Sequence, residues 1–195
     1  MLKKAITFVM VMGAIITVPS LAAEKFAIDV AHSSVEFSVK HLLISNVKGN
    51  FTDFSGIIMF DESDMTKSSV ETTIKAASID TDNADRDNHL RSEDFFDVEK
   101  YPEITFISND IIRTSNGFEM LGTLSMHGVS KEISIPFEFL GRAEGSSGDV
   151  RLGFEGYTTI DRKDFGISWN KTLDSGGLAV GNEVKIELNI EAVKM

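Results

Sequence analysis

Apolar and polar residues alternate with a period of two over most of the chain after residue 23, and this alternation is the feature that most constrains the fold. Residues 35–41, 70–76, 133–139 and 184–190 show it most clearly. Side chains along a β-strand point alternately to opposite faces, so each segment predicts a strand with one buried face. Residues suited to turns lie between such segments, as in 61–64 (DESD) and 115–117 (SNG). We therefore expect about eight strands, connected mostly as antiparallel hairpins.

One segment, residues 80–96, lacks this alternation. We expect Thr81 or Asp82 to cap a short helix over residues 83–91. The two arginines of this helix lie among acidic residues, which predicts local ion pairs that hold the helix against the strands. The alternative is that Arg86 and Arg91, with His89 on the same helix, contact the head group of a ligand.

The chain has no internal repeat and no proline-rich linker, so we expect one domain over residues 23–195. The predicted fold class is all-β, an eight-stranded antiparallel barrel with a short helical insertion. A sandwich stays open as the alternative, and it would fill its core with side chains and leave no ligand cavity. The barrel is favoured by glycines within strand-like segments, which often mark bulges or bends, at Gly49, Gly56, Gly122, Gly153 and Gly156.

Residues 1–22 have the pattern of a cleavable secretory signal. Lys3 and Lys4 precede an uncharged run over residues 5–18, and small residues precede the expected cleavage after Ala22. The run is shorter than the roughly 20 apolar residues of a membrane-spanning helix. We therefore expect an exported protein with no stable membrane span.

Composition excludes several classes of function. With 19 basic and 30 acidic residues the formal net charge is -11, which disfavours nucleic-acid binding. The absence of cysteine excludes disulfides, thiol catalysis and cysteine-ligated metals. The Gly-x-Ser-x-Gly motif of α/β hydrolases is absent, and carboxylate pairs of the glycosidase type arise by chance in so acidic a chain. We expect the charges of residues 161–164 to be solvated in a turn.

The four histidines do not predict a metal site. His32 and His41 are expected on one strand, where a separation of nine residues places them on opposite faces. His89 and His127 are expected in a helix and a turn, and no pair has the short spacing of a preformed site. We predict neither a bound metal nor a catalytic residue.

Four ordered blocks resemble the YceI-like family of exported proteins. The first comprises residues 32–37 (HSSVEF) and 47–56 (VKGNFTDFSG), and the most distinctive comprises residues 86–97 (RDNHLRSEDFFD) and 101–106 (YPEITF). Residues 122–131 (GTLSMHGVSK) and 164–167 (DFGI) resemble the two later blocks. The resemblance spans essentially the whole mature chain.

This resemblance implies an extended lipocalin-like barrel whose apolar tunnel holds an isoprenoid or another long-chain amphiphile. The expected role is a periplasmic carrier with no cofactor other than a bound lipid, such as a polyprenyl or quinone species. An enzyme or stress-protective factor acting on such a lipid is the alternative. A homodimer formed through barrel edges or a helix face stays open.

Alternation along the expected strands selects side chains for the tunnel wall, although ordinary core packing is an equally strong explanation for each apolar one. His41, Arg86 and His89 are added as candidates for contact with a head group. The complete set of predicted ligand-binding residues is Val35, Phe37, Val39, His41, Phe51, Ile74, Arg86, His89, Phe106, Leu124, Phe137, Phe139, Phe154, Trp169 and Ile186.

Overall fold

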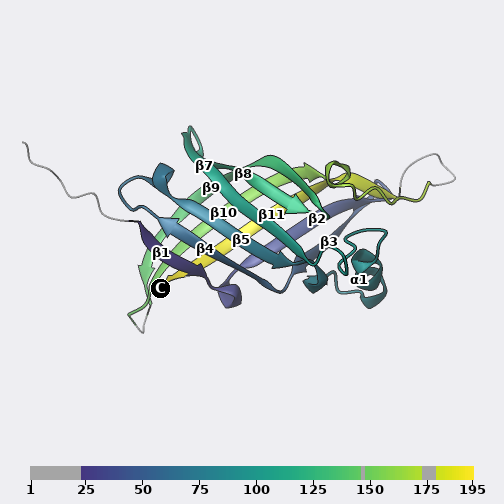
Figure 1. Cartoon of the computed structure of the whole chain (residues 1–195), viewed down its shortest axis with the longest axis horizontal. Helices are drawn as coiled ribbons and strands as arrows, with labels where there is room; N and C mark the ends of the chain where they lie inside the picture. Colours follow the sequence, from purple (N-terminus) through teal and green to yellow (C-terminus); the bar gives the residue numbers. More distant parts are fainter. Residues whose placement is uncertain (1–22, 146–147, 173–178) are drawn as a thin grey trace, which may run out of the picture.

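The strands of the chain form one antiparallel sheet in the computed structural model, which describes residues 23–145, 148–172 and 179–195 (Figure 1). The predicted signal, residues 1–22, lies outside the described residues. The strands are β1 (Glu24–Ile28), β2 (Ser34–His41), β3 (Ser45–Phe51), β4 (Phe54–Phe60), β5 (Ser69–Lys75), β6 (Ile79–Asp80), β7 (Glu103–Thr114), β8 (Gly117–Met126), β9 (Val129–Glu144), β10 (Val150–Asp161) and β11 (Val180–Lys194).

The sheet closes into a barrel, which confirms the predicted fold and rejects the sandwich. The ring runs β1-β4-β5-β7-β8-β9-β10-β11, and β1 pairs with β11 through Phe26 and Lys194. The N-terminal part of β11 pairs instead with β2, which continues through β3 to β6. Thus β1 with β2, β3 with β4, and β5 with β6 each occupy one position around the barrel. The barrel therefore has eight strand positions, as predicted, and three of these positions are each made of two shorter strands.

The interruption between β1 and β2 is a short 3-10 helix, η1 (Val30–His32). Asp29 begins it by accepting a hydrogen bond from the backbone N–H of Ala31 at 3.1 Å. His32 therefore lies outside β2, and the prediction that it shares a strand with His41 was wrong. Two further 3-10 helices, η2 (Met65–Lys67) and η3 (Ala76–Ser78), lie before and after β5.

The predicted helical insertion is α1 (Ala84–Arg91), but its cap is Asn83 rather than Thr81 or Asp82. The Asn83 side-chain oxygen accepts from the backbone N–H of Arg86 at 3.0 Å. Thr81 has other partners, because its backbone N–H and hydroxyl both donate to the buried carboxylate of Asp87, at 3.0 and 2.5 Å. None of the described helices is both long and apolar enough to cross a bilayer.

The arginines of α1 bind backbone oxygens rather than the predicted acidic partners. Arg86 donates to the carbonyl of Thr81 at 2.6 Å and to its hydroxyl at 2.7 Å. Arg91 donates to the carbonyls of Ala77 and Ile79 at 2.7 and 2.6 Å. The reason is the position of β6 at the end of the sheet, where it pairs only with β3 and leaves carbonyls facing α1. Hydrogen bonds from charged donors therefore attach a helix that has little apolar surface of its own.

Aromatic side chains fill the end of the barrel where β1 and β11 meet. The rings of Phe60 and Phe139 lie 5.3 Å apart between centroids, and those of Phe139 and Phe154 lie 5.2 Å apart. Phe26 packs edge-on against Phe60 at 6.0 Å and is fully buried. We call Phe26, Phe60, Phe139 and Phe154 the aromatic plug. It closes this end with close-packed side chains.

Arg162 corrects the expectation that residues 161–164 carry only solvated charges. It begins η4 (Arg162–Phe165) and is only 4% exposed. Its guanidinium donates to the carbonyls of Ile167 at 2.8 Å, Trp169 at 2.9 Å and Gly181 at 2.9 Å. Burial lowers the pKa of this guanidinium from its ordinary value. Arg162 thus joins the segment after β10 to the start of β11.

The glycines predicted to mark bulges do so in part. Gly153 and Gly122 lie at register shifts, in the β9–β10 and β7–β8 pairings. Gly49 instead makes room for an aromatic ring: it pairs with Phe37, and a Cβ added to it would lie 2.5 Å from the Phe37 ring and 2.7 Å from the Asp80 carbonyl. A methyl group does not fit there without movement of the backbone.

We predict that Gly49→Ala lowers the free energy of unfolding by about 1–3 kcal/mol, because overpacking shifts Phe37 and β6. Gly153→Ala is the matched control, since a Cβ at this position meets Leu140 at an ordinary 3.5 Å. Urea unfolding of both variants measures the difference. Equal stability of the two would contradict this account of Gly49.

We predict that Arg162→Met destabilises the barrel by roughly 2–4 kcal/mol, because buried carbonyls then lose their charged donor. Lys163→Met removes a neighbouring exposed charge and should have little effect. Thermal unfolding followed by circular dichroism compares the two variants. A neutral result for Arg162 would mean that water replaces the guanidinium.

Candidate functional site

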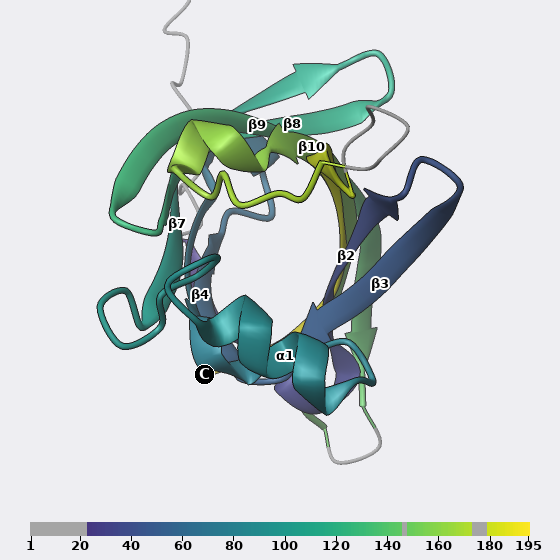
Figure 2. The same ribbon diagram turned by 90° about the vertical axis from the view of Figure 1, so that its right-hand side faces the viewer.

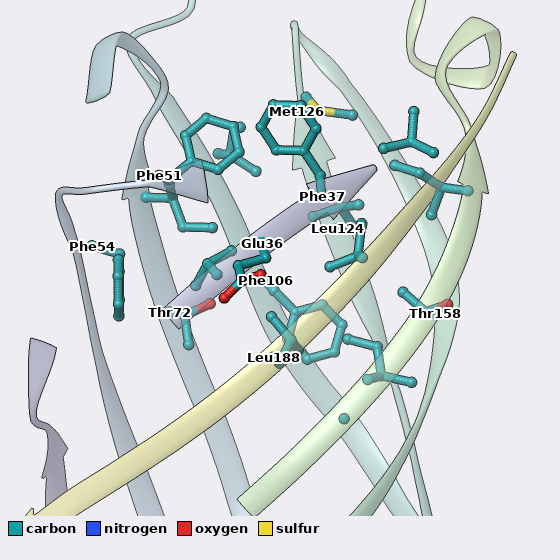
Figure 3. Close-up of a pocket in the computed structure, with 18 of the residues that line it drawn as sticks. Glu36, Phe37, Phe51, Phe54, Thr72, Phe106, Leu124, Met126, Thr158 and Leu188 are labelled. Atoms are coloured by element: carbon teal, nitrogen blue, oxygen red, sulfur yellow. The ribbon is translucent and has the colours of Figure 1, made fainter. Parts of the chain in front are cut away.

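An apolar cavity of about 440 Å³ lies inside the barrel, and all eleven strands contribute to its wall. Figure 3 shows Phe37, Phe106, Leu124, Met126 and Leu188 around it. These residues come from four neighbouring or facing strands, β2, β7, β8 and β11. The cavity exists because the ring is wide enough for side chains to cover the wall without meeting across the centre.

Fourteen of the fifteen predicted residues line this cavity. The exception is Phe139, which points inward but belongs to the aromatic plug. Alternation identifies the inward face of β9 and does not show how far along the barrel the cavity extends. The residues that line it as predicted are Val35, Phe37, Val39, His41, Phe51, Ile74, Arg86, His89, Phe106, Leu124, Phe137, Phe154, Trp169 and Ile186.

The prediction missed other parts of the wall. Met120 and Met126 line the cavity from β8, where they continue the alternation of Leu124 and were therefore detectable. Phe95 and Phe96 also line it, although they follow α1 in a turn that has no periodic pattern. Flexible methionines and rotatable rings give such a wall the ability to adapt to its contents.

A cluster of rings borders the end of the cavity that faces α1. The His89 ring meets Trp169 edge-on at 4.7 Å and Phe95 at 5.0 Å, and Phe95 and Trp169 lie 5.2 Å apart. The Nε2 atom of His89 is 2.9 Å from a carboxylate oxygen of Asp94, which orients the imidazole. Figure 2 looks along the barrel from this end and shows α1, the β2–β3 hairpin and the segment after β10 around the opening.

Basic groups are concentrated at this end. His41, Arg86 and His89 contribute to the lining, as do Arg162, whose guanidinium donates to backbone carbonyls, and Lys40, whose side chain is exposed. The lining carboxylic residues, Glu36 and Glu155, have exposed side chains. The cavity thus has an apolar interior closed by the aromatic plug and a rim rich in hydrogen-bond donors. Such a site suits an amphiphile whose tail is buried and whose head group accepts hydrogen bonds.

Asp29, His32 and Glu191 form a second cluster, whose ligand atoms lie within 4.8 Å of one another. A guanidinium occupies this cluster: Arg151 lies 2.8 Å from Asp29 and also pairs with Glu191 and Asp149. Hydrogen bonds from His32 and Arg151 lower the pKa of Asp29 to about 2. The cluster is an ion-pair network that joins η1 to β10 and β11, and it gives no evidence for a cation.

The chain is similar in sequence and in fold to known proteins. The chain is 36% identical to a UPF0312 protein of Pseudomonas aeruginosa over 196 residues, which covers 100% of both. The crystal structure of a Campylobacter jejuni YceI protein is 38% identical with a TM-score of 0.67, covering 80% of this chain and 90% of that one. A polyisoprenoid binding domain from Saccharophagus degradans shares the fold at 16% identity and a TM-score of 0.62, over 90% of this chain and 100% of that one. The family model of the YceI-like domain matches residues 26–192, and the chain therefore belongs to the YceI-like family.

Proposed function

We propose that this protein binds a polyisoprenoid-type or other long-chain amphiphilic lipid inside the barrel and carries it through the periplasm. The observation that carries the proposal is the cavity itself, which is apolar along its length, closed by the aromatic plug and bordered by basic groups at one end. Each methylene group that enters such a cavity contributes about 0.8 kcal/mol. The polyisoprenoid binding described for the Saccharophagus domain, which has the same fold, agrees with this chemistry.

The rim supports a ligand with a polar or anionic head group. Arg86 and His89 lie on the same helix, one turn apart, and both reach the cavity lining. Arg86 uses two of its donor nitrogens on Thr81, and its remaining N–H groups are the donors that a phosphate or carbonyl head group would use. A tail in the interior then places the head group beside α1.

We favour a carrier over an enzyme because two of the titratable side chains at the rim, those of His89 and Arg162, have structural partners. His89 is paired with Asp94, and the Arg162 guanidinium is directed at carbonyls. The periplasmic location rests on the pattern of residues 1–22 and on family membership.

The decisive experiment is native mass spectrometry of the protein purified from its own periplasm, followed by extraction and identification of the bound lipid. We expect one intact isoprenoid or related amphiphile per barrel. An empty protein that also takes up no added polyprenol would reject the carrier role. A chemically converted lipid would instead support the enzyme alternative.

We predict that Phe37→Asp weakens polyprenol binding at least about tenfold, because a carboxylate in an apolar cavity is poorly solvated. Ile107→Asp is the matched control, since Ile107 is 49% exposed on the barrel exterior. Leu188→Trp, which fills the cavity without adding charge, should also reduce binding. Fluorescence titration with a labelled polyprenol measures all three variants. Unchanged binding by folded Phe37→Asp and Leu188→Trp proteins would show that the lipid does not occupy this cavity.

We predict that Arg86→Gln reduces the preference for a polyprenyl phosphate over the matching polyprenol by about fivefold or more, because one charged hydrogen bond is lost. Arg91→Gln is the control: Arg91 attaches α1 to backbone carbonyls in the same way and is not part of the cavity lining. Competition between the two lipids gives the preference directly. An equal loss in both variants would assign Arg86 a purely structural role.

A further inference from the structure

The turn between β2 and β3 carries two adjacent, strongly exposed aliphatic side chains. Leu43 is 69% exposed and Ile44 is 83% exposed. The other large exposed apolar residues of the described chain, such as Leu140 and Tyr157, are separated from one another along the sequence. Exposed apolar pairs at a turn are unfavourable in water unless another apolar phase receives them.

The backbone of this turn is also strained. Leu42 and Leu43 have φ values of 52° and 63°, and Ile44 N–H donates to the His41 carbonyl at 3.2 Å to close the turn. Positive φ at both central positions favours Asn-Gly or Gly-Gly, because a Cβ makes this conformation unfavourable by about 1–2 kcal/mol for each residue. The chain thus has leucines where glycine would be more stable. Such strain commonly accompanies a functional contact.

The charge around the turn differs from that of the rest of the protein. Residues 37–52 contain no aspartate or glutamate, in a chain with a formal net charge of -11. Lys40 and Lys48 are exposed, and the pairing of Ser38 with Lys48 and of Lys40 with Asn46 places both lysines on the outer face of the hairpin. Within the described part of the chain neither lysine forms an ion pair. This hairpin therefore offers an anionic partner two exposed lysines that have no ion-pair partner among the described residues.

The position of the turn connects it with the cavity. Val39, Lys40, His41 and Val47 line the cavity from the same hairpin. Leu42 N–H donates to the Ala179 carbonyl at 2.9 Å, which fixes the turn against the start of β11. Figure 2 shows the hairpin at the rim, beside α1 and the opening of the barrel. A surface that receives the turn would therefore also face the mouth of the cavity.

We propose that the β2–β3 turn docks on an anionic phospholipid bilayer, with Leu43 and Ile44 inserted among the lipids and Lys40 and Lys48 near the phosphates. Two aliphatic side chains and two lysines give weak, reversible membrane binding, which suits a carrier that arrives and leaves. The proposal goes beyond lipid binding in the barrel, because it concerns where the mouth is placed. It does not depend on the identity of the cargo.

The test is co-sedimentation of residues 23–195 with vesicles of phosphatidylglycerol and phosphatidylethanolamine. Leu43→Gly should reduce the bound fraction and raise the melting temperature, because glycine relieves the positive φ. Ile44→Ser should also reduce binding, and the double variant should lower the partition coefficient about tenfold or more. Leu140→Ser, which removes an exposed leucine elsewhere, should bind as the unaltered protein does.

Salt and lipid composition give an independent readout. Raising sodium chloride from about 0.1 M to about 1 M shortens the Debye length from about 10 Å to about 3 Å, so binding should fall. Vesicles of phosphatidylcholine alone should bind less protein. The proposal is overturned if the unaltered protein does not bind anionic vesicles. It is also overturned if the stabilised Leu43→Gly variant binds these vesicles as well as the unaltered protein does. A dimer that these substitutions convert to monomers, without vesicle binding by either form, would assign the turn to a second copy of the chain.

Uptake of a labelled polyprenol from detergent separates this proposal from the proposed function. Leu43→Gly should retain uptake, because Leu43 is not among the residues that line the cavity. Vesicle binding without uptake would reject the carrier function and leave the docking surface standing. Uptake without vesicle binding would reject the docking surface and support the carrier function.

Discussion

The antiparallel pairing of β1 with β11 is the contact on which the rest of the structure depends. It joins the first and last strands of the barrel, so no strand of the ring has a free edge at this end. The paired residues include Phe26, which is fully buried, and β1 also pairs with β4. Closure therefore fixes the aromatic plug, and the plug determines which end of the barrel is shut. The asymmetry of the cavity follows from this seam.

The alternation of apolar and polar residues predicted the strands and their inward faces. It did not predict the length of the cavity or the cap of α1. It identified the inward faces of β2, β5, β9 and β11, because a closed sheet has one apolar and one polar face. Alternation assigned Phe139 to the cavity because periodicity gives the direction in which a side chain points. It does not show where along the barrel axis the cavity ends. The capping of α1 by Asn83 depends on the other partners of Thr81, which the sequence does not show.

The polar interactions were the least predictable part of the site. Sequence reasoning assigned Arg86 and Arg91 to nearby acids and left Arg162 to solvent, whereas all three donate to backbone carbonyls. Those carbonyls are available because β6 has one neighbour and because the segment after β10 leaves the sheet. Side-chain composition has no signal for unpaired backbone oxygens, since these arise only when the topology is complete.

The two ends of the barrel divide the tasks that a lipid carrier requires. Burial of an apolar tail is non-directional, so the interior alone gives affinity without fixing orientation. Arg86 and His89 lie on α1 beside the opening, and an amphiphile bound as proposed would therefore enter tail first and keep its head group at the mouth. A mouth held against a bilayer by the β2–β3 turn would let the tail pass from the acyl layer into the barrel without crossing water. The strained leucines of that turn and the apolar cavity would then serve one step, the transfer of a tail between two apolar phases.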